Sequence, residues 1–359
     1  MKYAIIGCSR IAINHITAAL DNKLEIVAFC DIDETRIDSL LLKHGLEDDL
    51  SIKRYLDYRQ MLVEEPEIEL IAIATGSGSH AAIALDCIKA KKHLIIEKPL
   101  ALSIKDADAI IKNAEQAGVL VSVCHQNRFN SAIQKLRQAL EAGRFGKLSH
   151  GSIHVRWNRG QDYFDQASWR GTWKQDGGCL MNQCIHGIDL LCWMMGGKVE
   201  SVYAQTRKRF HDYIEAEDVG MAVLAFSNGA IATIEGTTNV YPENLEETLY
   251  IFGQNGTVKI GGKSANSVEV WQFADSTSED DAQEGFSEQV ANVYGNGHGP
   301  LYADMKQAIT QGRKPYIDAT VGRDALEVVL AIYKSQKTGL PVTLPLDDFS
   351  SVDMQGEFL

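Results

Sequence analysis

Short apolar runs alternate with amphipathic stretches through the first third of the chain, and this alternation restricts the possible folds strongly. The runs are typical of buried strands, and the stretches between them have helical spacing. Strands that alternate with helices form βαβ units, so we expect a doubly wound, parallel α/β sheet with right-handed crossovers. The expected strands are Tyr3–Ile6, Glu25–Cys30, Leu70–Ala74, His93–Ile96 and Leu120–Cys124, and the expected helices cover residues 10–20, 33–45, 57–64, 79–91 and 103–117.

The pattern changes after residue 125, where period-2 runs become frequent. Asn-Gly separates pairs of these runs at residues 228–229 and 255–256, and this dipeptide is a strong hairpin signal. We therefore expect two domains: a dinucleotide-binding Rossmann domain (1–125) and an α+β domain with a large, mainly antiparallel sheet (126–359). In the second domain we expect helices at 130–142, 177–195, 301–310 and 319–334, strands at 149–157, 199–208, 218–226, 230–240, 248–252, 257–260 and 267–273, and a polar loop at Asp275–Glu284.

The composition argues against several functional classes. The chain of 359 residues has a net charge of −13, which disfavours nucleic acid or an anionic membrane as a partner. None of the seven cysteines forms a C-x-x-C pair, so we expect buried free thiols in a cytoplasmic protein and no metal site. The first residues already have the pattern of a strand rather than of a signal peptide, and no apolar run approaches the length of a membrane span.

The turn between the first expected strand and helix carries a modified dinucleotide fingerprint. Gly7-Cys8-Ser9-Arg10-Ile11-Ala12 follows G-x-G-x-x-A except that Ser9 replaces the middle glycine. Asp31 ends the second strand, where an acid accepts hydrogen bonds from the adenosine ribose and repels a 2′-phosphate. Asp31 can also be a helix N-cap, although Asp33 fits that role better. We therefore predict NAD as the cofactor, bound by Gly7, Ser9, Arg10, Ile11 and Asp31.

Other strand ends are expected at the same edge of the sheet, where open α/β folds bind their ligands. The sequence Glu97-Lys98-Pro99 follows one strand, and its proline restricts the direction of the lysine. The alternative for Lys98 is an ordinary surface lysine on a loop. His80 follows another strand and is a candidate cofactor contact, and its alternative role is that of a helix-cap residue. The further cofactor contacts that we predict at this edge are Thr75, Gly76, His80, Glu97, Lys98, Gln126 and Asn127.

An amide and an imidazole follow a Gly-Gly pair in the second domain. Asn182 and His186 are four residues apart, so they share one face of the helix expected at 177–195. A lone histidine on an apolar helix is more often a core residue. Oxidation of a secondary alcohol, however, needs a base for the hydroxyl proton and a cation for the developing alkoxide. His186 suits the first role and Lys98 the second, and Asn182 orients the histidine or binds a substrate hydroxyl.

These motifs together resemble those of the Gfo/Idh/MocA oxidoreductases over essentially the whole chain. The glycine turn, Asp31, Glu97-Lys98-Pro99, the Asn182-x-x-x-His186 segment and Gly-Leu-Pro-Val at 339–342 carry the resemblance. It implies that Lys98 and His186 are the catalytic lysine and histidine. The family often has aspartate at the position of Asn182, and an amide cannot shuttle a proton. Segments 125–130, 169–173 and 180–183 are similar to those of bacterial nucleotide-sugar dehydrogenases, which implies oxidation at C3 of a UDP-N-acetylglucosaminuronate-type sugar.

An anionic sugar substrate requires cations and stacking groups. Arg156 and Arg170 lie in one segment that can face such a substrate, and their alternative is ordinary surface arginines. Trp173 is ambiguous between the core and sugar or base stacking. His298 precedes the helix expected at 301–310 and can close the pocket. The substrate contacts that we predict are Lys98, Arg156, Arg170, Trp173, Asn182, His186 and His298.

Rival functions remain open from the residues alone. They are a dehydrogenase of a free sugar or a cyclitol such as inositol, a glycosidase that uses NAD transiently, and a nucleotide-binding regulator, which would need neither Lys98 nor His186. Alternating apolar positions on the strands of the second domain predict face-to-face pairing and thus a homodimer or homotetramer. These positions are Val223, Ala225, Ile231, Thr233, Leu249 and Ile251.

Overall fold

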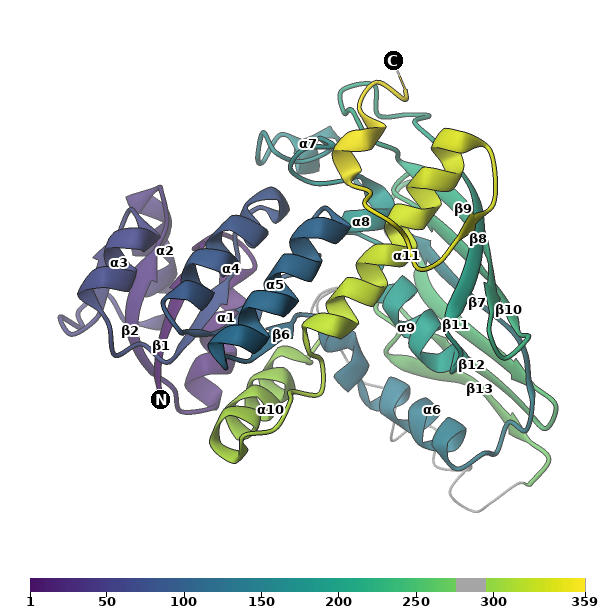
Figure 1. Ribbon diagram of the computed structural model, residues 1–359, viewed down its shortest axis with the longest axis horizontal. Helices are drawn as coiled ribbons and strands as arrows, with labels where there is room; N and C mark the ends of the chain where they lie inside the picture. The colour runs from purple at the N-terminus through teal and green to yellow at the C-terminus, as the bar shows by residue number, and fades with distance from the viewer. Residues whose placement is uncertain (276–294, 359) are drawn as a thin grey trace. The chain divides into compact units, whose positions relative to one another are not determined.

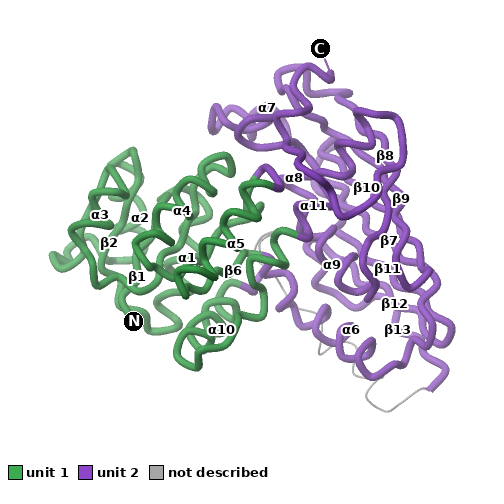
Figure 2. Tube along the Cα trace, viewed as in Figure 1, with its two compact units in different colours: residues 1–101, 105–124, 298–323 green, residues 102–104, 125–297, 324–359 purple. Residues whose placement is uncertain are grey.

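The computed structural model describes residues 1–275 and 295–358, and the chain forms two compact units (Figure 2). Unit 1 comprises residues 1–101, 105–124 and 298–323, and unit 2 comprises residues 102–104, 125–297 and 324–359. The second segment of unit 1 ends at residue 124, next to the boundary predicted after residue 125. Residues 298–323, which the sequence prediction assigned to the second domain, belong to unit 1. Most of the predicted loop Asp275–Glu284 lies outside the described residues.

Unit 1 is built on a six-stranded parallel sheet with the order β3-β2-β1-β4-β5-β6 (Figure 1). This is the order of a dinucleotide-binding fold, and it reverses direction between β1 and β4. All four residues of β4 are buried, as expected for a parallel strand that is covered on both faces. The strands are β1 (Lys2–Ile6), β2 (Glu25–Cys30), β3 (Lys53–Tyr55), β4 (Leu70–Ile73), β5 (His93–Ile96) and β6 (Val121–Val123).

The helices predicted for the first domain are all present in unit 1. The sequence prediction missed β3, because two of its three residues, Lys53 and Arg54, are exposed at the edge of the sheet and no apolar run marks it. The helices are α1 (Ala12–Asp21), α2 (Glu34–His44), α3 (Tyr58–Glu64), α4 (His80–Lys89), α5 (Ile104–Ala117) and, from the later part of the chain, α10 (His298–Gln311).

Unit 2 contains an eight-stranded sheet with the order β13-β12-β11-β7-β10-β9-β8-β14. The pair β7 and β10 is parallel, and the other neighbouring pairs are antiparallel, which confirms the predicted class of sheet. The strands are β7 (Leu148–Arg156), β8 (Val199–Arg207), β9 (Val219–Phe226), β10 (Ile231–Thr237), β11 (Glu246–Gly253), β12 (Gly256–Gly261), β13 (Ser267–Phe273) and β14 (Val342–Thr343).

The single helix predicted for residues 177–195 is wrong, because the segment forms two helices. Helix α8 (Cys179–Asn182) ends at Asn182, and α9 (Ile185–Met195) places His186 in its first turn. Between them, the Cys184 N–H donates to the Cys179 carbonyl five residues earlier, at 3.1 Å. Such a wide turn is often found at functional sites. The remaining helices of unit 2 include α6 (Ser131–Glu141), α7 (Gln161–Phe164) and most of α11 (Ala319–Thr338). Within the described residues, no helix has the length and apolar character needed to cross a bilayer.

Helices α6, α8 and α9 cover one face of this sheet (Figure 1). A Cβ on Gly187 of α9 would lie 2.8 Å from Cγ1 of Ile153 in β7, so helix and strand pack closely. The residues predicted to pair face to face with a second copy do not all lie on one face of the sheet. Val223 and Ile231 are about half exposed, but Leu249 and Ile251 are fully buried, and Leu249 lies opposite Ile153 on the helix-covered face. Leu249 and Ile251 were therefore assigned to the wrong face.

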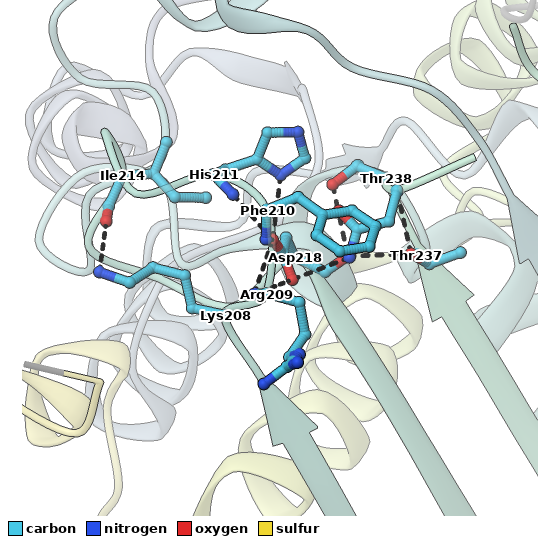
Figure 3. A network of polar contacts seen from close by, with 9 residues as sticks. Lys208, Arg209, Phe210, His211, Ile214, Asp218, Thr237 and Thr238 are labelled. Carbon is cyan, nitrogen blue, oxygen red and sulfur yellow. Dashed lines mark hydrogen bonds and ion pairs between the residues drawn. The ribbon is translucent and has the colours of Figure 1, made fainter. Parts of the chain in front are cut away.

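The loop between β8 and β9 is fixed by one buried carboxylate, Asp218 (Figure 3). It accepts hydrogen bonds from the backbone N–H groups of Arg209, Phe210 and His211 at 2.8–3.1 Å, and the His211 ring adds a contact at 3.1 Å. Burial alone raises a carboxyl pKa, but these donors lower the pKa of Asp218 to about 2.

We expect Asp218→Ala to destabilise the protein by roughly 2–4 kcal/mol at neutral pH, because three backbone donors lose their acceptor. A depressed carboxyl pKa adds stability above the unfolded value of about 4 and loses it as pH falls toward about 2. The difference between wild type and variant should therefore shrink over that range in denaturant titrations. Asp212→Ala, at an exposed position of the same loop, is the control. A pH-independent difference would contradict the assignment.

Candidate functional site

The end of β1 is built around a glycine that admits no side chain. Gly7 has a φ of +96°, and a Cβ there would lie 2.6 Å from the carbonyl carbon of Ala74, which follows β4. Two backbone segments thus approach each other where the strand order reverses, which is where open α/β sheets bind ligands. Ser9 and Arg10 are exposed on the turn that follows Gly7, and Ile11 is the N-cap residue of α1. No side chain caps α1 within the described residues, so its first backbone N–H groups suit a pyrophosphate.

Asp31 lies beside this turn at the end of β2. Its Oδ2 accepts a hydrogen bond from the Cys8 N–H at 2.7 Å, and its Oδ1 accepts one from the Asp33 N–H at 3.0 Å. The N-cap of α2 is Asp33, which accepts from the Thr35 N–H, so the expectation that Asp33 is the better cap is confirmed. A carboxylate held against the glycine turn fits the ribose of a dinucleotide.

His80 is a buried residue that connects the ends of two strands. It begins α4, and its Nδ1 lies 2.8 Å from the Pro99 carbonyl oxygen while its Nε2 lies 3.1 Å from the Thr75 carbonyl oxygen. The hydroxyl of Ser79 contacts the Thr75 hydroxyl and the Gly76 carbonyl at 2.8 and 2.7 Å. The ring of His80 is therefore engaged with the backbone on both sides, which favours a structural role over the predicted cofactor contact.

Glu97 is buried and contacts two histidines of unit 1. Its Oε1 lies 3.0 Å from His15 Nε2 and 3.5 Å from His298 Nε2. His298 was predicted to bind substrate, but it is buried against this carboxylate, which argues against that contact. The sequence prediction missed His15, a buried residue of α1 that contacts Glu97. Lys98 belongs to the same unit, and Pro99 follows it.

The junction of α8 and α9 supplies the second group of polar residues. Asn182 Nδ2 donates a hydrogen bond to Asp176 Oδ1, and Asp176 Oδ2 accepts from the Gly171 N–H at 2.7 Å. His186 lies edge-to-face with His125, at 5.7 Å between ring centroids. All four side chains belong to unit 2 and are buried. Asp176 and His125 are functional candidates that the sequence prediction missed, because neither has a recognisable spacing from Asn182 or His186.

The Gly-Gly pair before α8 accommodates a buried carboxyl group. A Cβ on Gly178 would lie 1.8 Å from Oε2 of Glu217. The Glu217 Oε1 accepts hydrogen bonds from the Leu180 N–H at 2.7 Å and from the Tyr333 hydroxyl at 2.9 Å. Burial raises the pKa of Glu217 to about 8. This contact explains the glycine at position 178, because a Cβ there would collide with the Glu217 carboxyl group.

The predicted cofactor residues Gln126 and Asn127 belong to the short helix η2 (Gln126–Phe129) in unit 2. Arg128 of η2 donates two hydrogen bonds to the Asp189 carboxylate of α9, from Nε at 2.7 Å and from Nη2 at 2.6 Å. This paired contact fixes η2 against the helix that carries His186. Asp189 also lies 4.0 Å from His125 Nδ1.

The other predicted substrate residues, Arg156, Trp173 and Arg170, lie in three different surroundings. Arg156 pairs with Glu235 at 2.5 Å and with Glu246 at 2.7 Å. Neighbouring residues of a strand point to opposite faces of the sheet, and Val155 contacts α9, so Arg156 points to the face opposite the helix that carries His186. Trp173 is buried edge-to-face against Tyr333, as expected for a core residue. These placements argue against both predicted contacts.

Arg170 lies over the ring of Tyr163, 4.0 Å from its centroid, and donates to the Tyr163 carbonyl at 2.6 Å. Tyr163 in turn accepts a hydrogen bond from Gln183 at the α8–α9 junction, at 3.0 Å. The buried Nε of Arg170 has no acceptor within residues 1–275 and 295–358. Arg170 is therefore connected, through Tyr163 and Gln183, to the junction of α8 and α9.

Comparisons with known proteins agree with this arrangement. Residues 1–125 match a model of an oxidoreductase family with an NAD-binding Rossmann fold, and residues 133–259 match the GFO/IDH/MocA C-terminal domain. The chain is 34% identical to the WlbA dehydrogenase from Bordetella pertussis, which was solved with NADH and UDP-GlcNAcA; the match covers 97% of this chain and 98% of that one, with a TM-score of 0.88.

Two further proteins show how wide the similarity is. The WlbA dehydrogenase from Chromobacterium violaceum, also solved with NADH and UDP-GlcNAcA, is 33% identical over 97% of this chain and 96% of its own, with a TM-score of 0.88. Myo-inositol 2-dehydrogenase from Thermotoga maritima is 29% identical over 264 residues, which are 72% of this chain and 74% of that protein.

The fold and these matches define an NAD-dependent oxidoreductase of the sugar and cyclitol dehydrogenase class. The chain belongs to the GFO/IDH/MocA family. The resemblance noted from the motifs is thus confirmed, and so are the predicted NAD cofactor and the Rossmann fold.

We expect Gly7→Ala to abolish NAD binding, because the new Cβ meets the Ala74 backbone, which has no room to move. Gly45→Ala is the matched control: Gly45 also has a positive φ, of 65°, but a Cβ there meets nothing within 4 Å. The control should lose about 1–2 kcal/mol of stability through backbone strain and keep its NAD affinity. Thermal melts and calorimetric titration with NAD compare the two, and equal effects on NAD affinity would contradict the proposed role of Gly7.

Proposed function

We propose that the protein oxidises a secondary hydroxyl of a nucleotide-sugar by hydride transfer to NAD, with C3 of UDP-N-acetylglucosaminuronate as the favoured substrate. The observation that carries the proposal is the 34% identity to a WlbA dehydrogenase across 97% of the chain, together with the Lys98 and His186 motifs. The connection of Arg170 to the α8–α9 junction supports an anionic substrate, since an arginine can pair with a phosphate or carboxylate.

In the proposed mechanism, His186 removes the proton of the substrate hydroxyl, and the ammonium group of Lys98 stabilises the alkoxide that develops. NAD, when bound, supplies the hydride acceptor. Asn182 orients the sugar through its amide oxygen, because its Nδ2 is directed to Asp176. In this assignment, the carboxylate of Asp176 holds the amide of Asn182. Asn182 occupies the position where the family often has aspartate, so Asp176 supplies a carboxylate beside that position.

The position of Asp31 at the glycine turn favours NAD over NADP. The Asp31 carboxylate already accepts two backbone hydrogen bonds at the glycine turn, so it remains fixed where a 2′-phosphate would meet it. Arg36 lies 3.9 Å from Asp31 but also pairs with Asp33 at 3.3 Å, which keeps the local charge negative. A cyclitol dehydrogenase is the alternative function, supported by the match to myo-inositol 2-dehydrogenase.

We expect His186→Ala and Lys98→Met each to lower turnover by roughly 10²–10⁴-fold with UDP-N-acetylglucosaminuronate and NAD, because each removes one of the two groups that act on the hydroxyl. The formation of NADH, followed by its absorbance, is the measurement. His186→Ala should bind NAD nearly as well as wild type, since the turn residues that hold the cofactor are unchanged.

Three outcomes would overturn parts of this proposal. Wild-type turnover in both variants would show that the chemistry uses other residues. Faster NADH formation with myo-inositol than with the nucleotide-sugar would favour the cyclitol dehydrogenase, and release of a free sugar without net NADH would favour an NAD-using glycosidase.

The open face of the sheet in unit 2 supports a homo-oligomer as part of the proposal. Tyr203, Met221, Val223 and Ile231 are 43–57% exposed on neighbouring strands, which is a large apolar surface for a soluble sheet. Pairing of this face with a second copy would remove it from water.

We expect Val223→Glu to convert the oligomer to a monomer, because it places a charge at the centre of that face. Light scattering at micromolar concentration is the measurement. Val63→Glu, at an 80% exposed position on α3 of unit 1, is the control and should leave the oligomer intact. A monomeric wild type would contradict the proposal.

A further inference from the structure

A chain of buried polar side chains in unit 1 ends at Glu97. His15 lies between the carboxylate and a pair of tyrosines: its Nε2 is 3.0 Å from Glu97 Oε1, and its Nδ1 is 2.7 Å from the Tyr302 hydroxyl. That hydroxyl is 2.8 Å from the hydroxyl of Tyr3. His298 reaches the same oxygen of Glu97 at 3.5 Å. The five residues come from β1, α1, α10 and the end of β5, and all are buried.

The hydrogen bonds of this chain are consistent with one arrangement of protons. Burial lowers the pKa of His15 and raises the pKa of both Tyr3 and Tyr302, so all three are neutral near pH 7. A neutral His15 that donates from Nε2 to Glu97 accepts at Nδ1 from Tyr302. Tyr302 then accepts from Tyr3.

Glu97 is the charged member of this chain. Burial alone raises a carboxyl pKa, but hydrogen bonds from His15 and His298 hold the pKa of Glu97 well below its usual value. The arrangement therefore fixes one negative charge in the interior of unit 1, next to Lys98 in the sequence.

The backbone around Lys98 is held at three points. The Lys98 N–H lies 3.3 Å from Glu97 Oε2, the carboxylate oxygen that the histidines do not use. The Glu97 N–H donates to the Ile73 carbonyl of β4 at 2.9 Å, and the Pro99 carbonyl lies 2.8 Å from His80 Nδ1. These contacts fix the direction in which the Lys98 side chain leaves the sheet.

We propose that Glu97 is a positioning residue for Lys98, and that His15, His298 and Tyr302 keep its carboxylate oriented for that task. The proposal rests on the proposed role of Lys98 in the reaction. The proposal assigns two effects to Glu97. The carboxylate fixes the backbone of Lys98, and its negative charge favours the cationic form of the Lys98 side chain. Residues from a helix about 200 positions later, α10, thereby support the motif at the end of β5.

A bound metal ion is the competing explanation for this cluster. Ligand atoms of His15, Glu97, Cys124 and His298 lie within 4.8 Å of one another, and this donor set suits zinc. One observation favours hydrogen bonds instead: Nε2 of His15 and Nε2 of His298 already lie 3.0 and 3.5 Å from the same carboxylate oxygen of Glu97.

The test compares Glu97→Gln with wild type, using NAD and UDP-N-acetylglucosaminuronate. We expect kcat to fall about 10–100-fold, as for other residues that orient a reacting group, and the alkaline limb of the pH profile to move to lower pH. Nitrogen NMR of labelled histidine should show a neutral His15 with its proton on Nε2 in wild type, and this signal should change in the variant. In calorimetric titration, the dissociation constant for NAD should change by a smaller factor between wild type and Glu97→Gln than kcat does.

The matched control is His93→Gln, at the opposite end of the same strand. His93 Nδ1 accepts a hydrogen bond from the Leu120 N–H at 2.9 Å, so the variant perturbs β5 without touching Lys98. It should lose stability but keep the wild-type kcat and pH profile. If Glu97→Gln does not fold, Tyr302→Phe removes the donor to His15 and keeps the ring, and it should shift the profile in the same direction by a smaller amount.

Three results would overturn the proposal. The first is a wild-type kcat and pH profile in Glu97→Gln or, where that variant does not fold, in Tyr302→Phe. The second is the same loss of kcat in His93→Gln, which would indicate a general effect of strand stability. The third is stoichiometric metal in the purified protein that Glu97→Gln loses. Full turnover in Lys98→Met would instead reject the proposed function, so the two failures are distinguishable.

Discussion

The contact between Gly7 and the peptide after β4 determines where unit 1 can bind a ligand. A side chain at Gly7 would meet the Ala74 backbone at 2.6 Å, so the two segments approach this closely only with glycine. The approach lies where the strand order reverses, between β1 and β4. Asp31 follows β2 and Lys98 follows β5, so parallel strands bring both to the edge that the glycine turn occupies.

Unit 2 depends on a comparable contact, between Gly178 and the carboxyl group of Glu217. Glu217 packs where a Cβ would otherwise be, and it accepts the Leu180 N–H at the start of α8. This anchors a helix of four residues that is too short to be stable by itself. The wide turn after α8 then determines how Asn182 and His186 are directed, with Asp176 bound to the amide.

The sequence predicted the parallel sheet well, because strands covered on both faces are continuous apolar runs, and it identified Asp33 as a helix cap from local spacing. It failed where distant residues decide the outcome. The partners of Arg156, Glu235 and Glu246, come from strands 79 and 90 positions later, so no local pattern revealed them. The helix predicted for residues 177–195 is interrupted after Asn182 by a wide turn, which hydrophobic periodicity does not reveal. His298 and Glu97, which contact each other, are 201 positions apart in the sequence.

The central claim is that Lys98 and His186 act on one carbon–hydroxyl group whose hydrogen passes directly to NAD. Its most direct test uses UDP-N-acetylglucosaminuronate that carries deuterium at C3, with mass spectrometry of the NADH formed. The account predicts one deuterium in each NADH molecule, and strongly reduced formation of labelled NADH in His186→Ala. Unlabelled NADH from the deuterated sugar would contradict it.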